Sequence, residues 1–389
     1  MIGERYLEVV LRLAKLAPEL VDSYAGPAEL AARVASERPR TPAELEAEIR
    51  ELLEAVATEE DQARRAWLRA QLEALEVATR WVGGERLPYP EYVERCYSVR
   101  PRLEPEEAFA EAHRRLDVAL PGSGGVAART QAWLETQIVP PHLISAGLEA
   151  LGDELRERTR ERFGLPADEE VKFVVVSGER WSAFAEYTGD LKSEIFVNMD
   201  LPIPSFVLLE LVAHEVYPGH HTEHVAKEVA LVPHGYLEVQ VFLYPTPQAL
   251  VAEGIAELAL EALLGDDAEE AGAAALRPLG IPYDAETAAA VRRAKKALKP
   301  LQQNVLLLDL PTEDAWAYKR RWMLEPDEFV DKSIEAIRKQ SWRPYFSCYP
   351  EGYRLCRAFV DGDPGRFGRL LNEQLTPADL RSGPPPRTP

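Results

Sequence analysis

The stretch that decides the fold runs from Phe206 to His221 and reads FVLLELVAHEVYPGHH. Its first eight residues are apolar apart from Glu210, so they predict a helix that is buried on nearly every side. That helix would carry His214 and Glu215 into the interior. Five of the seven histidines lie between positions 214 and 234. Because histidine is the commonest metal ligand among side chains, we expect a metal site here.

The spacing of these histidines differs from that of the common zinc helix. A His-Glu-x-x-His helix uses two histidines four residues apart, with the Glu as general base. Here Pro218 and Gly219 precede the next histidine. Pro218 has no N–H to bond the carbonyl of His214, so we expect the helix to bend or widen just after Glu215. Gly219 supplies the backbone freedom for that distortion.

Either His220 or His221 is the second ligand. In a regular helix, seven residues turn roughly 700°, which brings His221 near the face of His214 but about 10 Å along the axis. Two donors at about 2 Å from one ion do not easily span that distance. A widened turn that absorbs two extra residues places His220 where an i+4 histidine would lie. We therefore expect His220 to bind the metal, with His221 as the alternative.

A third ligand is expected on the predicted helix 248–264, which carries Glu253, Glu257 and Glu261 on one face. Its other residues are mostly apolar, and a buried carboxylate is costly unless it is paired or metal-bound. Glu253 is the predicted ligand, and Gly254 allows another backbone or the metal helix to come close. Glu257 is expected to hold a ligating histidine. This ligand set predicts one Zn²⁺ ion.

Three motifs resemble the bacterial family known as domain of unknown function 885, over residues 170–360. The family has a His-Glu-x-x-Pro-Gly-His-His helix, a Glu-Gly-Trp-Ala-x-Tyr helix and a later Tyr-x-x-Gly segment. The chain matches them with His214–His221, Glu253–Ala256 and Tyr349–Gly352, although Ile255 replaces the Trp. The family is similar to helical zinc peptidases such as carboxypeptidase Taq and the oligopeptidases.

This resemblance implies a zincin-like helical metallopeptidase architecture. It assigns zinc binding to His214, His220 and Glu253, and the role of general base to Glu215. An oxyanion needs a hydrogen-bond donor besides the metal. Tyr349 is the candidate donor from the family pattern, and His234 and Tyr236 are alternatives.

The pattern of the whole chain predicts an α+β fold, predominantly α-helical, with one small antiparallel sheet. We expect an N-terminal helical region over 1–165, a zincin-like catalytic region over 166–381 and a disordered tail over 382–389. Short β-branched runs predict strands at 171–176, 182–187 and 194–199. Helices are expected at 42–58, 60–82, 105–118, 124–163 (interrupted near Pro140), 248–264, 284–310 (kinked at Pro300), 312–323, 326–340 and 352–361.

Composition limits the partners. The chain has 45 basic and 65 acidic residues, a net charge of −20, which argues against nucleic acid or an anionic membrane. Its three cysteines have no metal-type spacing and favour a reduced setting, so the predicted location is cytoplasmic. The N-terminus lacks an apolar signal core, and the absence of a long apolar run predicts no membrane span.

The sequence therefore predicts a zinc-dependent hydrolase, in the first place a metallopeptidase that cleaves peptides with metal-activated water and Glu215 as base. The expected substrate is a small peptide or amide, and the strand at 194–199 is a candidate partner for an extended peptide. Two alternatives stay open: a catalytically inactive helical metal-binding or interaction protein, and a hydrolase of a non-peptide amide or ester. The oligomeric state is not predicted.

Overall fold

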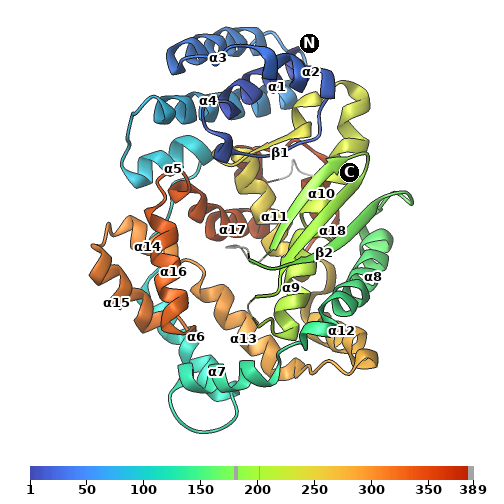
Figure 1. Cartoon of the computed structure of the whole chain (residues 1–389), viewed down its shortest axis with the longest axis vertical. Helices are drawn as coiled ribbons and strands as arrows, with labels where there is room; N and C mark the ends of the chain where they lie inside the picture. The colour runs from blue at the N-terminus through green and yellow to red at the C-terminus, as the bar shows by residue number, and fades with distance from the viewer. Residues whose placement is uncertain (179–182, 201, 384–389) are drawn as a thin grey trace.

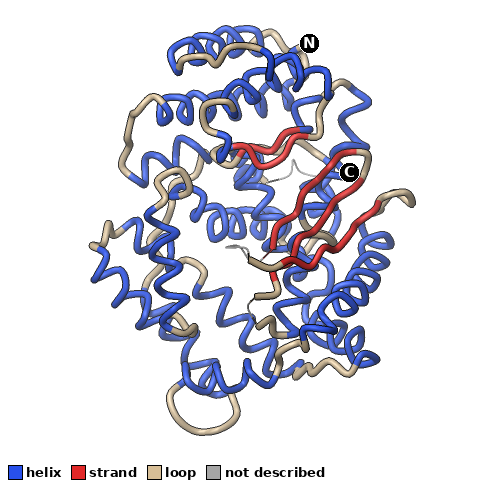
Figure 2. The backbone as a smooth tube through the Cα atoms, viewed as in Figure 1, coloured by secondary structure: helices blue, strands red, loops and turns tan. Residues whose placement is uncertain are grey.

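The computed structural model describes residues 1–178, 183–200 and 202–383, and helices dominate it (Figure 1; Figure 2). The prediction of a mainly helical α+β fold is confirmed. The helices before the main sheet are α1 (Ile2–Ala14), α2 (Ala28–Ser36), α3 (Pro42–Val56), α4 (Gln62–Val82), α5 (Tyr89–Tyr97), α6 (Glu106–Ala119), α7 (Val126–Thr136) and α8 (Ile144–Phe163).

The helices after the sheet include those that carry the predicted metal ligands. They are α9 (Ser205–Glu215), α10 (His220–Leu231), α11 (Pro247–Leu264), α12 (Ala268–Leu276), α13 (Ala285–Leu298), α14 (Leu301–Leu307), α15 (Thr312–Trp322), α16 (Asp327–Arg338), α17 (Tyr353–Val360), α18 (Pro364–Asn372) and α19 (Pro377–Ser382). Among the described residues, no helix is long and apolar enough to cross a membrane.

Local sequence signals set several helix boundaries. Thr41 and Glu44 form the reciprocal hydrogen bonds of a capping box at the start of α3. Pro300 separates α13 from α14, because proline cannot donate the helical hydrogen bond. At the other end, Ser382 is the last residue of α19 rather than the start of a disordered tail. The rest of the predicted tail from position 384, and the predicted strand start at Ser182, lie outside the described residues.

The strands form two sheets rather than one. β2 (Glu170–Val176), β3 (Ala183–Gly189) and β4 (Lys192–Asn198) form a sheet in the order β2-β4-β3. β3 and β4 are antiparallel, as predicted, but β2 pairs with β4 in parallel, so this sheet is mixed. β1 (Val21–Tyr24) pairs in antiparallel fashion with β5 (Val241–Leu243), a separate two-stranded sheet that the sequence analysis missed.

Two hydrophobic clusters pack the strands against the surrounding helices. Ile195 and Val197 of β4 are buried with apolar side chains from α8, α9, α11 and α12. Val241 and Leu243 of β5 are buried among side chains of α1, α3 and α4. Regions before and after residue 166 therefore share cores, and the proposed division into two regions stays a prediction.

Candidate metal centre

The α9–α10 junction brings the first two predicted ligands together. α9 ends at Glu215 and α10 begins at His220, so the helix breaks where Pro218 led us to expect it. Gly219 passes directly against the backbone of His214, and a Cβ at this position would overlap the His214 carbonyl group. The rings of His214 and His220 lie edge to face with centroids 4.9 Å apart. The glycine is therefore required by close approach.

Glu253 of α11 completes this pair. One carboxylate oxygen, Oε2, lies 3.5 Å from His214 Nε2, and the other, Oε1, lies 3.7 Å from His220 Nε2. Donors that share a tetrahedral zinc at about 2.0–2.2 Å are themselves roughly 3.3–3.6 Å apart. Each histidine therefore lies at about this distance from one oxygen of Glu253, while the donor atoms that all lie within 4.8 Å of one another are those of His214, Glu215 and His220. The structure brings together the three residues to which the sequence assigned the metal.

The hydrogen bonding of Glu253 gives a second test of this fit. Its carboxylate is 3% exposed, and Oε1 accepts a hydrogen bond from the hydroxyl of Tyr345. Oε2 has no hydrogen-bond partner among the residues that the structure describes. A buried carboxylate oxygen without a partner costs free energy, and a cation bound between Glu253 and the two imidazoles would remove that cost.

Without a metal, the same groups form an ion pair. Burial raises the pKa of Glu253, but the proximity of His220 and His214 outweighs it and lowers the pKa to about 2. Burial lowers the pKa of His220, but Glu253 outweighs it and raises the pKa to about 9. A metal must therefore displace a proton from His220 at neutral pH, so its affinity depends on pH.

Two further glutamates flank His214. Glu215 Oε1 lies 4.0 Å from His214 Nε2, and the donor atoms of His214, Glu215 and His220 all lie within 4.8 Å of one another. Glu215 lines a cleft, which suits a group that exchanges protons with a substrate or water. On the other side of the ring, Glu257 Oε1 lies 3.8 Å from His214 Nδ1 and pairs with Lys299. Glu257 occupies the place expected for a group that orients His214.

Tyr349 lies in the same site. It belongs to a single π-helical turn, Cys348–Gly352, and it lines the cleft with His214 and Glu215. Burial raises the pKa of Tyr349 well above its usual value, and the nearby carboxylates add to this shift. Its phenol therefore stays protonated at neutral pH and can donate a hydrogen bond.

Two glycines fix the position of that turn. A Cβ on Gly254 of α11 would overlap the backbone of Gly352, and a Cβ on Gly352 would overlap the carbonyl of Leu250. The close approach expected at Gly254 is thus to another backbone rather than to the metal helix. It explains physically why Glu-Gly and Tyr-x-x-Gly occur as separate motifs, because each glycine makes room for the other.

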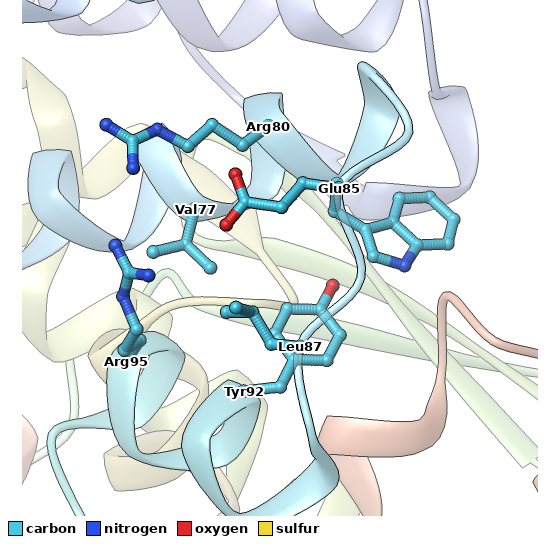
Figure 3. Close-up of a pocket in the computed structure, with 7 residues that line it drawn as sticks. Val77, Arg80, Glu85, Leu87, Tyr92 and Arg95 are labelled. Carbon is cyan, nitrogen blue, oxygen red and sulfur yellow. The ribbon is translucent and has the colours of Figure 1, made fainter.

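The cleft beside the cluster has a volume of about 940 Å³. Its wall includes His214, Glu215, Glu257 and Tyr349, together with residues of α7, α13, α15 and α16. A volume of this size accommodates an organic substrate. A smaller cavity of about 10 Å³ between α4 and α5 has room for a single water at most. Figure 3 shows residues that line it, among them Arg80, Glu85 and Tyr92.

The structure turns His221 away from the metal cluster, which contradicts the alternative ligand. Its Nδ1 lies 2.8 Å from Ser193 Oγ and its Nε2 lies 3.0 Å from Glu169 Oε2. The reason is that α10 begins at His220, and successive residues of a helix point about 100° apart. His220 therefore faces the cluster while His221 faces the sheet. Both ring nitrogens of His221 are hydrogen-bonded.

His234 does not reach the site either. It is exposed at the end of a 3-10 turn that follows α10. The 12 residues of α10 separate it from the break by roughly 18 Å of helix. His234 is absent from the described residues that line the cleft. The hydroxyl of Tyr236 donates a hydrogen bond to Asp61, and Tyr236 is likewise absent from the described cleft lining. Tyr349 is therefore the best placed of the three predicted donors.

The expectation that the strand at 194–199 pairs with an extended substrate is wrong. β4 is the central strand, with β2 on one side and β3 on the other, so both of its edges are occupied. β2 and β3 are the edge strands of this sheet, and among their described residues only Ala183 of β3 lines the cleft. Of the two edge strands, β3 is therefore the better placed for strand-like pairing with a substrate.

Sequence reasoning also missed Asp22, which β1 brings toward the metal centre. Its carboxylate accepts a hydrogen bond from Tyr244, whose ring lies 4.9 Å from that of Tyr345. Burial raises the pKa of Asp22 to about 6, with opposing effects from the Tyr244 hydrogen bond and the charge of His220. No local signal marks Asp22, because it depends on pairing between β1 and β5, more than 200 residues apart.

Two solved structures resemble this fold. One is described as a putative lipoprotein from Colwellia psychrerythraea, with a TM-score of 0.54, 17% identity and coverage of 87% of this chain. This chain spans 65% of the length of that protein. The other, similarly described and of unknown function, is from Shewanella oneidensis, with a TM-score of 0.51, 13% identity and coverage of 90% of this chain and 74% of that one. At these identities the likeness concerns the fold alone. The sequence matches no protein-family profile and no curated protein.

Proposed function

We propose that the protein is a zinc-dependent hydrolase, with peptides as its substrate class and a zincin-like arrangement of its helices. The observation that carries the proposal is the buried Glu253 Oε2, which has no hydrogen-bond partner among the described residues and lies 3.5 Å from His214 Nε2. His214, His220 and Glu253 would hold the ion. The resemblance to domain of unknown function 885 points the same way and rests on the three motifs.

The chain's own residues suit the hydrolysis of an amide. Bound zinc would supply a Lewis acid for attack by water on a carbonyl group. Glu215, on the cleft side of His214, would take the proton of the attacking water and pass it to the leaving amine. Tyr349 would donate its hydroxyl proton in a hydrogen bond to the developing oxyanion. Glu257 would hold the ring of His214 in its binding orientation.

The test compares metal content and turnover in the same samples. Wild-type protein is expected to bind one zinc per chain and to hydrolyse members of a peptide library. Glu215→Gln is expected to keep the zinc and to lose at least about a hundredfold in kcat/KM, because it removes the general base. Glu253→Gln is expected to lose zinc. Glu261→Gln, two turns along α11 and paired with Lys296, is the matched control and keeps it.

Three results would count against the proposal. Zinc binding that survives Glu253→Gln would place the metal elsewhere. Hydrolysis that survives Glu215→Gln would remove that residue as the base. Full zinc occupancy without turnover on peptides, other amides and esters would favour a metal-binding interaction protein instead.

A further inference from the structure

The cleft wall carries a row of cations on α13 and at its C-terminal end. Arg292, Lys295, Lys296 and Lys299 recur at helical spacing and all line the cleft. Each of them forms an ion pair with a glutamate: Glu269, Glu325, Glu261 and Glu257 respectively. These four charges are therefore neutralised within the protein and leave no strong demand for an anion.

Lys319 of α15 differs from that row. It also lines the cleft, yet it is only 2% exposed. Its ammonium group donates a hydrogen bond to Gln302 Oε1, and no carboxylate among the described residues forms an ion pair with it. The nearby Glu325 is paired with Lys295 at 3.0 Å. Because an ammonium has three donors, a buried cation with one neutral partner keeps unused capacity for an anion.

The surroundings of Lys319 form a built site. Gln302 is held in place by a hydrogen bond of 3.1 Å from its Nε2 to the carbonyl of Ser333, which leaves its Oε1 facing Lys319. Four of the cleft-lining residues near it are apolar: Leu298, Leu301, Met323 and Phe329. Glu325 and Glu328 line the same part of the cleft, and Glu325 is held by Lys295. A buried cation without an ion-pair partner among the described residues, next to apolar side chains, suits a ligand with a carboxylate beside an apolar group.

This site is continuous with the metal centre. Glu257, 3.8 Å from His214, pairs with Lys299, and Gln302 follows Lys299 by three residues across Pro300. His214, Glu257, Gln302 and Lys319 thus line one cleft. A substrate that reaches the metal with its reacting carbonyl can extend along this wall.

We propose that Lys319 binds a carboxylate of the substrate and so makes the enzyme selective for peptides that carry a free carboxylate on one side of the cleaved bond. This inference rests on the proposed hydrolase function. Two sources have the required chemistry: the α-carboxylate at the C-terminus of a peptide, and the side chain of an Asp or Glu residue. Burial also lowers the pKa of Lys319 to about 7, and a bound carboxylate would keep it protonated.

The experiment uses zinc-loaded, full-length protein and three acetylated hexapeptides of alanine and leucine. One has a free C-terminus, one has a C-terminal amide, and one has the amide with Glu as its last residue. The wild type is expected to prefer at least one carboxylate peptide over the plain amide by about tenfold or more in kcat/KM. A hydrogen bond to a charged group contributes enough free energy for a ratio of this size. Whichever carboxylate peptide is preferred identifies the source.

The variants decide whether Lys319 causes the preference. Lys319→Met is expected to reduce the ratio of the rates to near one, and Lys319→Arg to restore part of it. Lys296→Met, which removes a paired charge from the same cleft and leaves Glu261 with Arg357, is the matched control and is expected to keep the ratio. Equal rates for the three peptides in the wild type would overturn the proposal. So would an unchanged ratio of rates in a Lys319→Met variant that keeps its thermal stability.

A binding measurement separates this inference from the proposed function. If the wild type cleaves none of the peptides, calorimetric titration with the same three peptides still tests Lys319. Tighter binding of a carboxylate peptide by about tenfold, lost in Lys319→Met, would support the site although hydrolysis had failed. Equal binding of all three peptides would overturn it.

Discussion

Two neighbouring histidines take part in clusters of opposite character. His220 faces His214 and Glu253, where a buried carboxylate oxygen is left without a hydrogen bond among the described residues. His221 faces Glu169 and Ser193, where both of its nitrogens are bonded. The first cluster has a carboxylate oxygen that a ligand could bind. In the second cluster, both nitrogens of His221 are already hydrogen-bonded to protein groups. The difference separates a cluster that can accept a ligand from a cluster that stabilises the fold.

The cluster around His221 and Glu169 attaches the α9–α10 break to the sheet. Tyr217, inside the α9–α10 break, donates a hydrogen bond of 2.8 Å to Glu169 Oε2. Glu169 is also hydrogen-bonded to His221 Nε2 and forms an ion pair with Arg156 of α8. Burial opposes ionisation of Glu169, but these three partners outweigh it and lower its pKa. The break beside the ligands is therefore held by a charged anchor that does not touch the metal cluster.

The strongest test of the comparison replaces each of the two histidines by alanine in a separate variant. His220→Ala removes a ligand and is expected to weaken zinc binding by at least about a thousandfold. His221→Ala is expected to keep stoichiometric zinc, because its side chain faces Glu169. Metal analysis and competitive titration with a chelator measure both. Comparable loss of zinc in the two variants would show that the two clusters do not act separately.

The second prediction concerns the anchor itself. Glu169→Gln is expected to lower the free energy of unfolding by about 3 kcal/mol, because it leaves Arg156 and a buried network without their carboxylate. Urea unfolding measures the change, and the exposed Glu186→Gln on β3 is the control. Zinc content is expected to stay at one per chain in the fraction that folds. A large loss of zinc affinity with little loss of stability would contradict the assigned role.

A smaller effect is expected for Glu257, whose proposed role is to orient a ligand rather than to bind the metal or to stabilise the fold. Its carboxylate lies 3.8 Å from His214 Nδ1, but Glu257 is not one of the three proposed ligands. Glu257→Gln is expected to reduce zinc affinity about 10- to 100-fold, the usual range for a residue that orients a ligand. Chelator competition gives the value. No change, or a complete loss, would place Glu257 outside or inside the ligand set respectively.

The smallest predicted effect is a change of stability with pH at Lys319, on the cleft side of the comparison. Burial lowers its pKa in the folded state to about 7, below the usual value of 10.5. The folded state therefore binds fewer protons than the unfolded state between these pH values, and the cost of the buried charge is complete below pH 7.

At pH 6.5, Lys319→Met is accordingly expected to have a free energy of unfolding about 1 kcal/mol or more above that of the wild type, and therefore a higher melting temperature. This advantage is expected to shrink as the pH rises from 7 toward 10. Thermal melts of both proteins across that range give the difference. A variant that is less stable than the wild type by the same amount at every pH would show that Lys319 stabilises the fold.

Sequence periodicity and local chemistry predicted many of the helices and the residues that meet at the α9–α10 break. Pro218 and Gly219 marked the break, and the buried helix around Glu253 marked that residue as a candidate ligand, because these signals lie within a few residues. The parallel pairing of β2 with β4 and the pairing of β1 with β5 depend on distant segments and left no local trace. For the same reason the direction of His221 could not be predicted, since its partner Glu169 lies 52 residues away.

The interlock of Gly254 with Gly352 has a consequence for biosynthesis. Glu253 accepts a hydrogen bond from Tyr345, and its helix packs against the turn that ends at Gly352. On the ribosome, His214 and His220 emerge more than 120 residues before that turn. The nascent chain must therefore carry its histidines for several seconds, at about 5–20 residues per second, before the last contact of the proposed metal centre exists. If the protein binds zinc as proposed, a complete site exists only on nearly finished chains.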